Sequence, residues 1–382
     1  LTTERDSVWL QAFGRYTWNF DRNAGDDRAY WVGELQKRFG TQEAAQHLLD
    51  YYELSGPIMP GIQNLLSIHN MNAHPTIVGR DANVEAILHS IRFNSLGSDL
   101  AQPLDRAAVR YYVKQFGGQE EDLAQRPPMS VREFVEHLAS GISDTRETVI
   151  TPRNLFQLFE SLAAQALESA KAATATASRN EAEVRRFVSD AEILRDVVGF
   201  YRYKSEAAIH KGLFDRLGRE DDARQMLAFL RKSVEHYRAL TDRASKAYSH
   251  PSDLNGVIGW ERMFTAFQDE LTFYEEQARL AKTGAEILCL GVQGPFQDFS
   301  NAFHWGMVEA ASQRKLGIAS YFIALSGLDK AKLAVVYNLS DSFVTAHQEE
   351  LMGWVERGGH LLVWDEHARL SVPNRLLPGL EV

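Results

Sequence analysis

The stretch Met226–Tyr237, MLAFLRKSVEHY, indicates the fold of most of this chain. Its apolar residues recur every three or four positions, as they do along one face of an α-helix. Two other stretches, Ile193–Tyr201 and Met263–Tyr274, show the same spacing. Long amphipathic helices joined by short breaks pack against one another with their apolar faces. The sequence therefore predicts an antiparallel helical bundle over residues 151–282.

Local signals mark where several helices begin and end. Thr151 and Pro152 form a helix start, with a capping hydroxyl before a proline. Ser130 and Glu133 form a capping box that opens a helix over Val131–Ala139. Nearer the start of the chain, a helix carrying Trp31, Leu35 and Phe39 should end at Gly40, and Thr41 should begin the next helix.

The last hundred residues have a different pattern. Short apolar runs alternate there with helical stretches, which is typical of a parallel α/β sheet. The expected strands are Glu286–Val292, Ile318–Leu325, Leu333–Asn338 and His360–Trp364, and the expected helices are Asn301–Gln313 and Thr345–Arg357. The predicted fold is thus mainly α with a C-terminal α/β domain, divided into residues 1–150, 151–282 and 283–382.

Composition excludes several classes of protein. The 382 residues carry a formal net charge of −10 and no basic run with interleaved aromatic residues, which argues against nucleic-acid binding. A single cysteine, Cys289, excludes a thiolate zinc site and an intrachain disulfide. The apolar runs are too short to span a membrane. We expect a soluble protein without a cofactor, and the sequence leaves its compartment open between cytoplasm and periplasm.

The most suggestive candidate site is the aromatic stretch Phe13–Asp21, FGRYTWNFD, near the start of the chain. Tryptophan faces stack on the C–H surface of a sugar, and an arginine fork pairs with a uronate carboxylate. The alternative is that the same residues pack the structure and satisfy strand ends. The candidate substrate-binding residues in this part of the chain are Trp9, Arg15, Tyr16, Trp18 and Asn19.

A second candidate is the irregular stretch that contains His69, Asn70 and His74. Binding groups concentrate on such stretches, although plain turn chemistry explains the same residues. Two histidines five positions apart, with no glutamate between them, do not have the spacing of a helical metal site, so no metal is expected.

Two further residues favour a structural role. Lys204 lies on a predicted helix close to Glu206, and a solvated helix face explains it. Cys289 lies within a predicted strand, EILCLGV, whereas an activated nucleophile lies on a turn into a helix. A self-sufficient hydrolase built on Cys289 is therefore the least favoured hypothesis.

Two resemblances connect the chain to carbohydrate-active enzymes. The residues Gly14, Arg15, Trp18, Asn19 and Asp21 resemble the stretch that leaves the last barrel strand in the α-glucuronidase group of glycoside hydrolases, with Phe20 in place of the usual proline. The run from Ala331 to Trp364 resembles the glutamine-amidotransferase-like domain of family-42-type β-galactosidases, which implies a flavodoxin- or amidotransferase-like sheet.

Both resemblances imply the C-terminal part of a barrel glycoside hydrolase that acts on oligosaccharides, and Arg15 suits uronate-bearing ones. In such enzymes the reacting carboxylates lie at the ends of barrel strands, so they are expected upstream of residue 1, and the catalytic residues of this chain are unknown. The implied partners are a carbohydrate, the upstream segment and further copies of the chain. The alternative is a non-catalytic structural module that mediates assembly.

Overall fold

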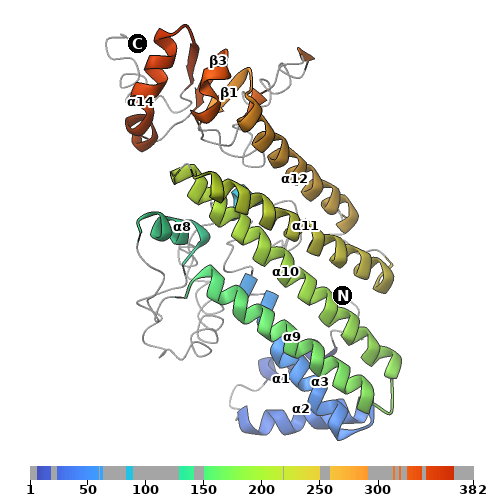
Figure 1. Cartoon of the computed structure of the whole chain (residues 1–382). Helices are drawn as coiled ribbons and strands as arrows, with labels where there is room; N and C mark the ends of the chain where they lie inside the picture. Colours follow the sequence, from blue (N-terminus) through green and yellow to red (C-terminus); the bar gives the residue numbers. More distant parts are fainter. Residues whose placement is uncertain are drawn as a thin grey trace. The chain divides into compact units, whose positions relative to one another are not determined.

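A computed structural model describes residues 7–18, 24–59, 61–62, 83–88, 129–141, 150–217, 219–249, 259–290, 313–314, 318–319, 325–337 and 341–364 (Figure 1). The chain divides into two compact units. The first contains residues 1–56 and 161–194, and the second contains residues 57–160 and 195–382. The long helices α9 (Pro152–Thr176) and α10 (Glu181–Leu217) contribute residues to both units. The three-part division of the sequence stays a prediction.

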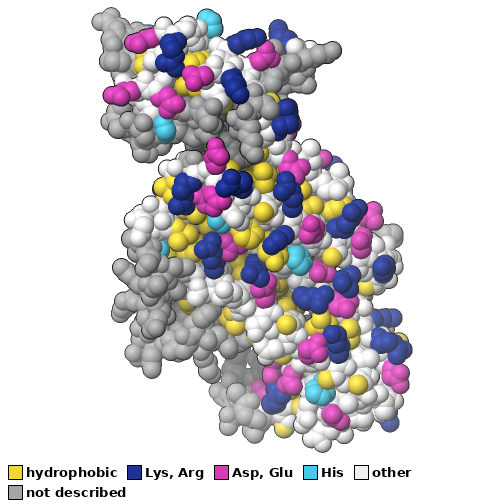
Figure 2. Space-filling view, viewed as in Figure 1, with side chains coloured by type: hydrophobic (Ala, Val, Ile, Leu, Met, Phe, Trp, Pro, Cys, Tyr) yellow, Lys and Arg dark blue, Asp and Glu magenta, His cyan; other side chains and the backbone are white. Residues whose placement is uncertain are grey.

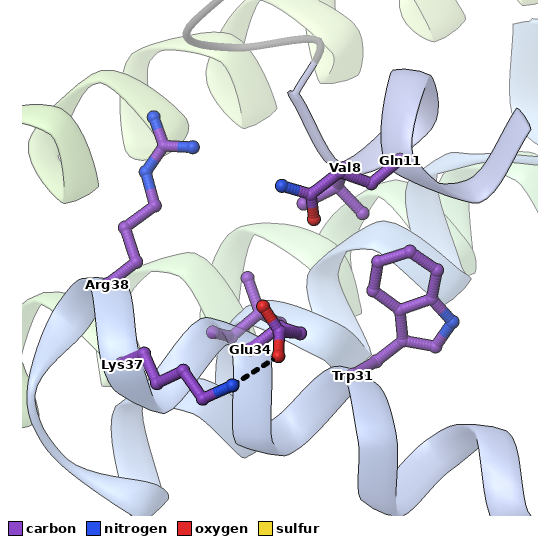
Figure 3. A pocket seen from close by; sticks show the side chains of 7 residues that line it. Val8, Gln11, Trp31, Glu34, Lys37 and Arg38 are labelled. Atoms are coloured by element: carbon purple, nitrogen blue, oxygen red, sulfur yellow. Dashed lines mark hydrogen bonds and ion pairs between the residues drawn. The ribbon is translucent and has the colours of Figure 1, made fainter. Parts of the chain in front are cut away.

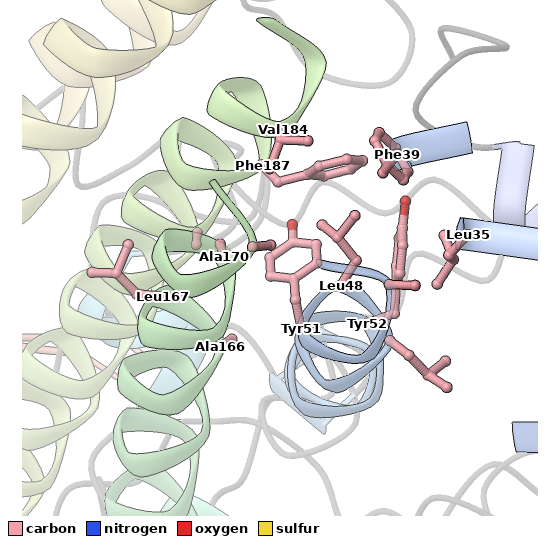
Figure 4. Packing of buried hydrophobic residues seen from close by; sticks show 14 of the residues in the cluster. Leu35, Phe39, Leu48, Tyr51, Tyr52, Ala166, Leu167, Ala170, Val184 and Phe187 are labelled. Carbon is pink, nitrogen blue, oxygen red and sulfur yellow. The ribbon is translucent and has the colours of Figure 1, made fainter. Parts of the chain in front are cut away.

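The first unit is helical. Helices α1 (Ser7–Trp18), α2 (Ala24–Phe39) and α3 (Gln42–Ser55) pack with the C-terminal part of α9 and the N-terminal part of α10. Figure 4 shows the aromatic centre of this packing, where Phe187 of α10 lies beside Phe39, Tyr51 and Tyr52. The apolar side of α3 faces this core, since Ala44, Ala45, Leu48, Leu49 and Tyr52 are all buried.

The predicted break between α2 and α3 is also confirmed. Gly40 has a φ of +96°, a conformation that side chains with a Cβ rarely adopt. A Cβ at this position would lie 2.1 Å from Oγ of Ser178, so glycine also makes room for the turn after α9. The hydroxyl of Thr41 then accepts a hydrogen bond from the amide of Ala44 at 3.0 Å and caps α3.

The aromatic opening of the chain is helical, which corrects the expectation of a strand exit. Residues Ser7–Trp18 form α1, and Val8 and Ala12, four positions apart, pack against the core of the first unit. This spacing is the helical period, and Gly14 lies exposed within α1. The resemblance to a barrel exit therefore does not extend to the local backbone.

The predicted antiparallel bundle is present in the second unit. Helices α10, α11 (Glu220–Ala247) and α12 (Trp260–Thr283) run alongside one another (Figure 1). Ser233 of α11 donates a hydrogen bond to the carbonyl of Phe200, and Arg243 pairs with Asp196, so α11 runs opposite to α10. Arg231 pairs with Glu275 at 2.7 Å between α11 and α12. The rings of Phe200, Tyr237 and Phe267 meet at the centre, with centroids 4.8–4.9 Å apart.

Two short helices complete the described part of the bundle. Helix α8 covers Val131–Ala139, and its predicted capping box is confirmed by reciprocal hydrogen bonds between Ser130 and Glu133. Helix α5 covers only Val84–Leu88, and the side chains of Val84, Glu85, Ile87 and Leu88 are all buried.

The C-terminal part contains a small parallel sheet of strands β1 (Ile287–Leu290), β2 (Ile318–Ala319), β3 (Leu333–Tyr337) and β4 (His360–Trp364). The strand order is β2-β1-β3-β4, and every pair is parallel. This order is the one found in doubly wound sheets. Cys289 lies on β1 opposite Val335, and the expected helix Asn301–Gln313 lies almost wholly outside the described residues.

Helix α14 (Asp341–Glu356) connects β3 to β4 and covers one side of the sheet. Its residues Leu351 and Trp354 pack against Leu288 and Ala334. Gly358, which follows this helix, has a φ of +98°, the left-handed conformation with which glycine ends helices. The fold is thus mainly helical with a small parallel sheet.

Buried tyrosines make the fold sensitive to alkaline pH. Burial raises the pKa of Tyr52, Tyr237 and Tyr274 above the ordinary tyrosine value. In the unfolded chain these phenols ionise near pH ~10, so their stabilisation is complete below that pH and is lost as the pH rises. We expect the free energy of unfolding to fall by up to about 1.4 kcal/mol per buried tyrosine for each further pH unit.

Denaturant unfolding of the wild type between about pH 9 and 11 measures this slope. Tyr237→Phe should remove the contribution of one buried tyrosine from the slope of unfolding free energy against pH. Replacement of the exposed Tyr30 by phenylalanine should leave the slope unchanged. Equal slopes for wild type and Tyr237→Phe would show that burial of this phenol does not govern the alkaline loss.

Candidate functional site

A pocket of about 270 Å³ lies between α1 and α2 in the first unit (Figure 3). Its apolar lining consists of Val8, Trp31 and Leu35. Its polar lining comes from both helices, because α1 contributes Gln11 and α2 contributes Glu34, Lys37 and Arg38. In Figure 3 the Gln11 amide and the Glu34 carboxylate face the same opening as the Trp31 indole.

The charges of the pocket are paired within the protein. Lys37 donates a hydrogen bond to Glu34 at 2.5 Å, and this contact raises the pKa of Lys37. Arg38 forms two hydrogen bonds with Glu183 of α10, at 2.5 and 3.2 Å. Lys37 is 75% exposed and its side chain can reorient. Arg38 is 28% exposed, and its two hydrogen bonds to Glu183 fix the guanidinium group.

This lining suits a small polyhydroxylated molecule. Amide and carboxylate oxygens accept hydrogen bonds from hydroxyl groups, and an ammonium group donates to hydroxyl or carboxylate oxygens. Apolar side chains provide the surface against which C–H groups pack. Trp31 is 6% exposed and meets Tyr30 edge to face with ring centroids 5.1 Å apart, so little of its indole surface is accessible to a ligand.

Arg15 is the one predicted site residue whose side chain the structure describes. Its guanidinium donates two hydrogen bonds to Oδ1 of Asp27, at 3.1 and 2.8 Å, and lies 3.5 Å from the ring centroid of Tyr30. Arg15 therefore joins α1 to α2 beside the pocket without lining it. Its role as a sugar contact stays a prediction.

The other predicted site residues stay predictions as well. Trp9, Tyr16 and Trp18 belong to α1, but their side chains are outside the description. The remaining four, Asn19, His69, Asn70 and His74, lie outside the described residues. Gln11, Glu34 and Lys37 are not predicted as site residues from the sequence. Nothing local marks them, because they line the pocket only where α1 and α2 meet.

A second group of polar side chains lies inside the second unit. This buried ionic cluster consists of Glu85 of α5; Lys204, Lys211 and Asp215 of α10; and Glu270 and Tyr274 of α12. Lys204 is fully buried, and Glu270, its partner, is 2% exposed. The ammonium group of Lys204 also lies 4.4 Å from the ring centroid of Phe267.

The two lysines differ in their electrostatics. Burial lowers the pKa of Lys204, and Glu270 offsets this only in part. Burial would also lower the pKa of Lys211, but the attraction of Asp215 and Glu85 outweighs it, so that pKa is raised. A buried charge is tolerated only when it is paired and hydrogen-bonded, which both lysines satisfy.

The interpretation of Lys204 as part of a solvated helix face is wrong. Glu206, its neighbour in sequence, pairs instead with Arg153 of α9 at 2.9 Å. The signal was present in the spacing, because Lys204 follows Val197 and Tyr201 by seven and three positions and so shares their buried face. Lys211 follows seven positions later on the same face.

Other classes of site find no support in the described residues. Within those ranges, no group of three or more His, Cys, Asp and Glu side chains could hold a metal ion. The helices of the described part include none long and apolar enough to cross a membrane. On the face shown in Figure 2, basic and acidic side chains are interspersed.

Comparison with solved structures finds chains with a similar fold. The structure of a GH138 glycoside hydrolase, described as targeting pectin rhamnogalacturonan II, has a similar fold with a TM-score of 0.58 and 20% sequence identity. The similarity covers 73% of this chain and 39% of that chain. No protein-family model matches the sequence, and no curated protein matches it. The fold is therefore similar to that of part of a glycoside hydrolase.

Proposed function

We propose that this chain is a non-catalytic part of a glycoside hydrolase that acts on oligosaccharides, with uronate-containing ones as the favoured class. The observation that carries the proposal is the fold similarity, which extends over 73% of the chain but only 39% of the GH138 enzyme. A part of that size supplies support and contact surface to a catalytic domain formed elsewhere.

The chemistry of the bundle interior agrees with a supporting role. Glycoside hydrolysis needs two carboxyl groups that flank a bound sugar, one as the acid and one as nucleophile or base. The buried acids Glu85 and Glu270 are instead bonded to Lys211 and Lys204 and are 2–3% exposed, so a sugar does not reach them. We place the reacting carboxylates outside this chain.

We propose the pocket between α1 and α2 as its carbohydrate contact. A single sugar ring matches the pocket in scale and in its mixture of apolar and polar lining. Lys37 is the side chain suited to a uronate carboxylate, because it is 75% exposed and pairs with Glu34 one helical turn before it. The ammonium group of lysine has three N–H donors, so a sugar carboxylate can bind beside Glu34 and add an ion pair.

Substitution of Lys37 tests this contact. Lys37→Gln should weaken binding of an acidic pectin oligosaccharide by up to about fivefold, which corresponds to the loss of one exposed ion pair. Lys171→Gln is the matched control. Lys171 forms the same kind of i,i+3 pair with Glu168, with an N–O distance of 2.8 Å, and neither residue lines the pocket. Calorimetric titration measures both affinities.

Equal affinities for wild type, Lys37→Gln and Lys171→Gln would remove the pocket from the proposal. Absence of any carbohydrate binding would favour the alternative, a structural module that mediates assembly. One observation favours that alternative: both cations of the pocket are already paired, Lys37 with Glu34 and Arg38 with Glu183. Assembly into a homo-oligomer stays a prediction under either hypothesis.

A further inference from the structure

The buried ionic cluster joins three elements that are far apart in sequence. Lys204 and Lys211 lie seven positions apart, two turns along the same face of α10, and Glu270 and Tyr274 lie four positions apart on α12. Helix α5 bonds to both helices. Residues 83–88 are the described part of the chain between residues 62 and 129, and Val84–Leu88 of them form α5.

Each polar contact of α5 fixes a different feature of its position. The amide of Val84, at the first turn of α5, donates a hydrogen bond to Oε1 of Glu270 at 2.7 Å. The other oxygen of that carboxylate bonds to Lys204. Glu270 thus caps the start of α5 from another helix, and Lys204 holds the capping carboxylate in place.

The side chain of Glu85 makes the second set of contacts. Its Oε1 accepts a hydrogen bond from the hydroxyl of Tyr274 at 3.1 Å and lies 3.3 Å from Nζ of Lys211. Lys211 is held in turn by Asp215, one turn further along α10. Burial, with the nearby carboxylates Glu85, Glu270 and Asp215, keeps the pKa of Tyr274 well above its ordinary value, so its hydroxyl stays a donor.

A helix of five residues is too short to be stable by itself, so α5 depends on its contacts. Apolar packing holds α5 on the bundle but allows shifts in its position along α10 and α12. Buried charged groups allow only the one position in which each is paired. Leu88 adds a close apolar contact, because its Cδ1 lies only 2.7 Å from where a Cβ on Gly212 would be.

We propose that the buried ionic cluster is a lock that fixes α5 in a single register on α10 and α12. The lock acts through three contacts in two sets: the bond from the Val84 amide to Glu270, and the two contacts of Glu85 with Lys211 and Tyr274. Release of either set frees α5 while the long helices remain packed through their own apolar faces.

Hydrogen exchange of the folded chain, read by mass spectrometry, tests the lock. Glu85→Gln removes the charge that Lys211 and Tyr274 bind but keeps the shape of the side chain. We expect exchange in the peptide that contains Val84–Leu88 to become about 10- to 100-fold faster, the factor that corresponds to loss of a charged hydrogen bond. Peptides of α11, over Met226–Tyr237, should keep their protection.

Glu206→Gln is the matched control, because it breaks the Arg153–Glu206 pair of the same unit without touching α5. It should leave exchange at Val84–Leu88 unchanged. If Glu85→Gln does not fold, Tyr274→Phe removes one hydrogen bond of the lock and should accelerate the same peptide to a smaller degree. Unchanged exchange at α5, or equal acceleration at α5 and α11, would overturn the proposal.

Discussion

Replacement of Lys204 by methionine should lower the free energy of unfolding by about 3–5 kcal/mol, because it leaves a buried carboxylate without its counter-ion. Glu270 is 2% exposed, and Lys204 is its ion-pair partner. Methionine has nearly the volume of the lysine side chain, so the loss reports the charge and not a cavity. Denaturant unfolding monitored by circular dichroism measures it.

The double variant separates the charge from the shape. Glu270→Gln alone leaves Lys204 buried without a counter-ion and should cost a similar amount. Combined with Lys204→Met it removes both charges, while the glutamine oxygen can still accept the bond from the Val84 amide. The double variant should therefore lose much less free energy of unfolding than the two single variants lose together.

An exposed lysine provides the control for this cycle. Lys232 lies 5.3 Å from the ring centroid of Tyr203 on the surface of α11, and Lys232→Met should change stability by less than about 1 kcal/mol. Additive effects of Lys204→Met and Glu270→Gln would contradict the assignment of the two residues as a coupled buried pair.

Phe187→Ala should have the second largest effect and should act on the first unit. Its ring centroid lies 5.5 Å from that of Tyr51, 5.7 Å from Tyr52 and 6.1 Å from Phe39 (Figure 4). Removal of such a ring leaves a cavity between α2, α3 and α10 and costs about 3–5 kcal/mol. Hydrogen exchange should show the loss in α2 and α3.

The exposed Leu10→Ala is the control for Phe187→Ala. Leu10 is 55% exposed on α1, so its truncation should change stability by less than about 0.5 kcal/mol. Equal losses of protection in α2 and in α11 after Phe187→Ala would show that residues 1–56 and 161–194 do not respond as a separate unit.

Much of the fold could be predicted from the sequence because local signals and burial agree. In the stretch Met226–Tyr237 the residues on one helical face, Met226, Leu227, Leu230, Val234 and Tyr237, are buried. The capping box of Ser130 and Glu133 forms as expected. The parallel strands were recognisable because each is a short apolar run between helical stretches. The order in which the strands pair cannot be predicted in this way, because no local feature of β1 specifies β3 as its neighbour.

The candidate sites were harder to predict, for two physical reasons. The pocket between α1 and α2 depends on how two helices meet, so Gln11 and Glu34 carry no signal of their own. The charge of Lys204 favours a solvent-exposed position, whereas its helical spacing favours burial, and the sequence alone does not show that the spacing decides. Its partner Glu270 lies 66 positions away, and only the tertiary fold brings the two together.

Hydrolysis of pectin oligosaccharides tests the central claim most directly, namely that this chain is a non-catalytic part of a glycoside hydrolase. The purified 382-residue chain and the product of the complete open reading frame that contains it should be assayed side by side. We predict release of sugar by the complete product and none by the chain alone. Hydrolysis by the chain alone, or no glycosidase activity in the complete product, would contradict the account.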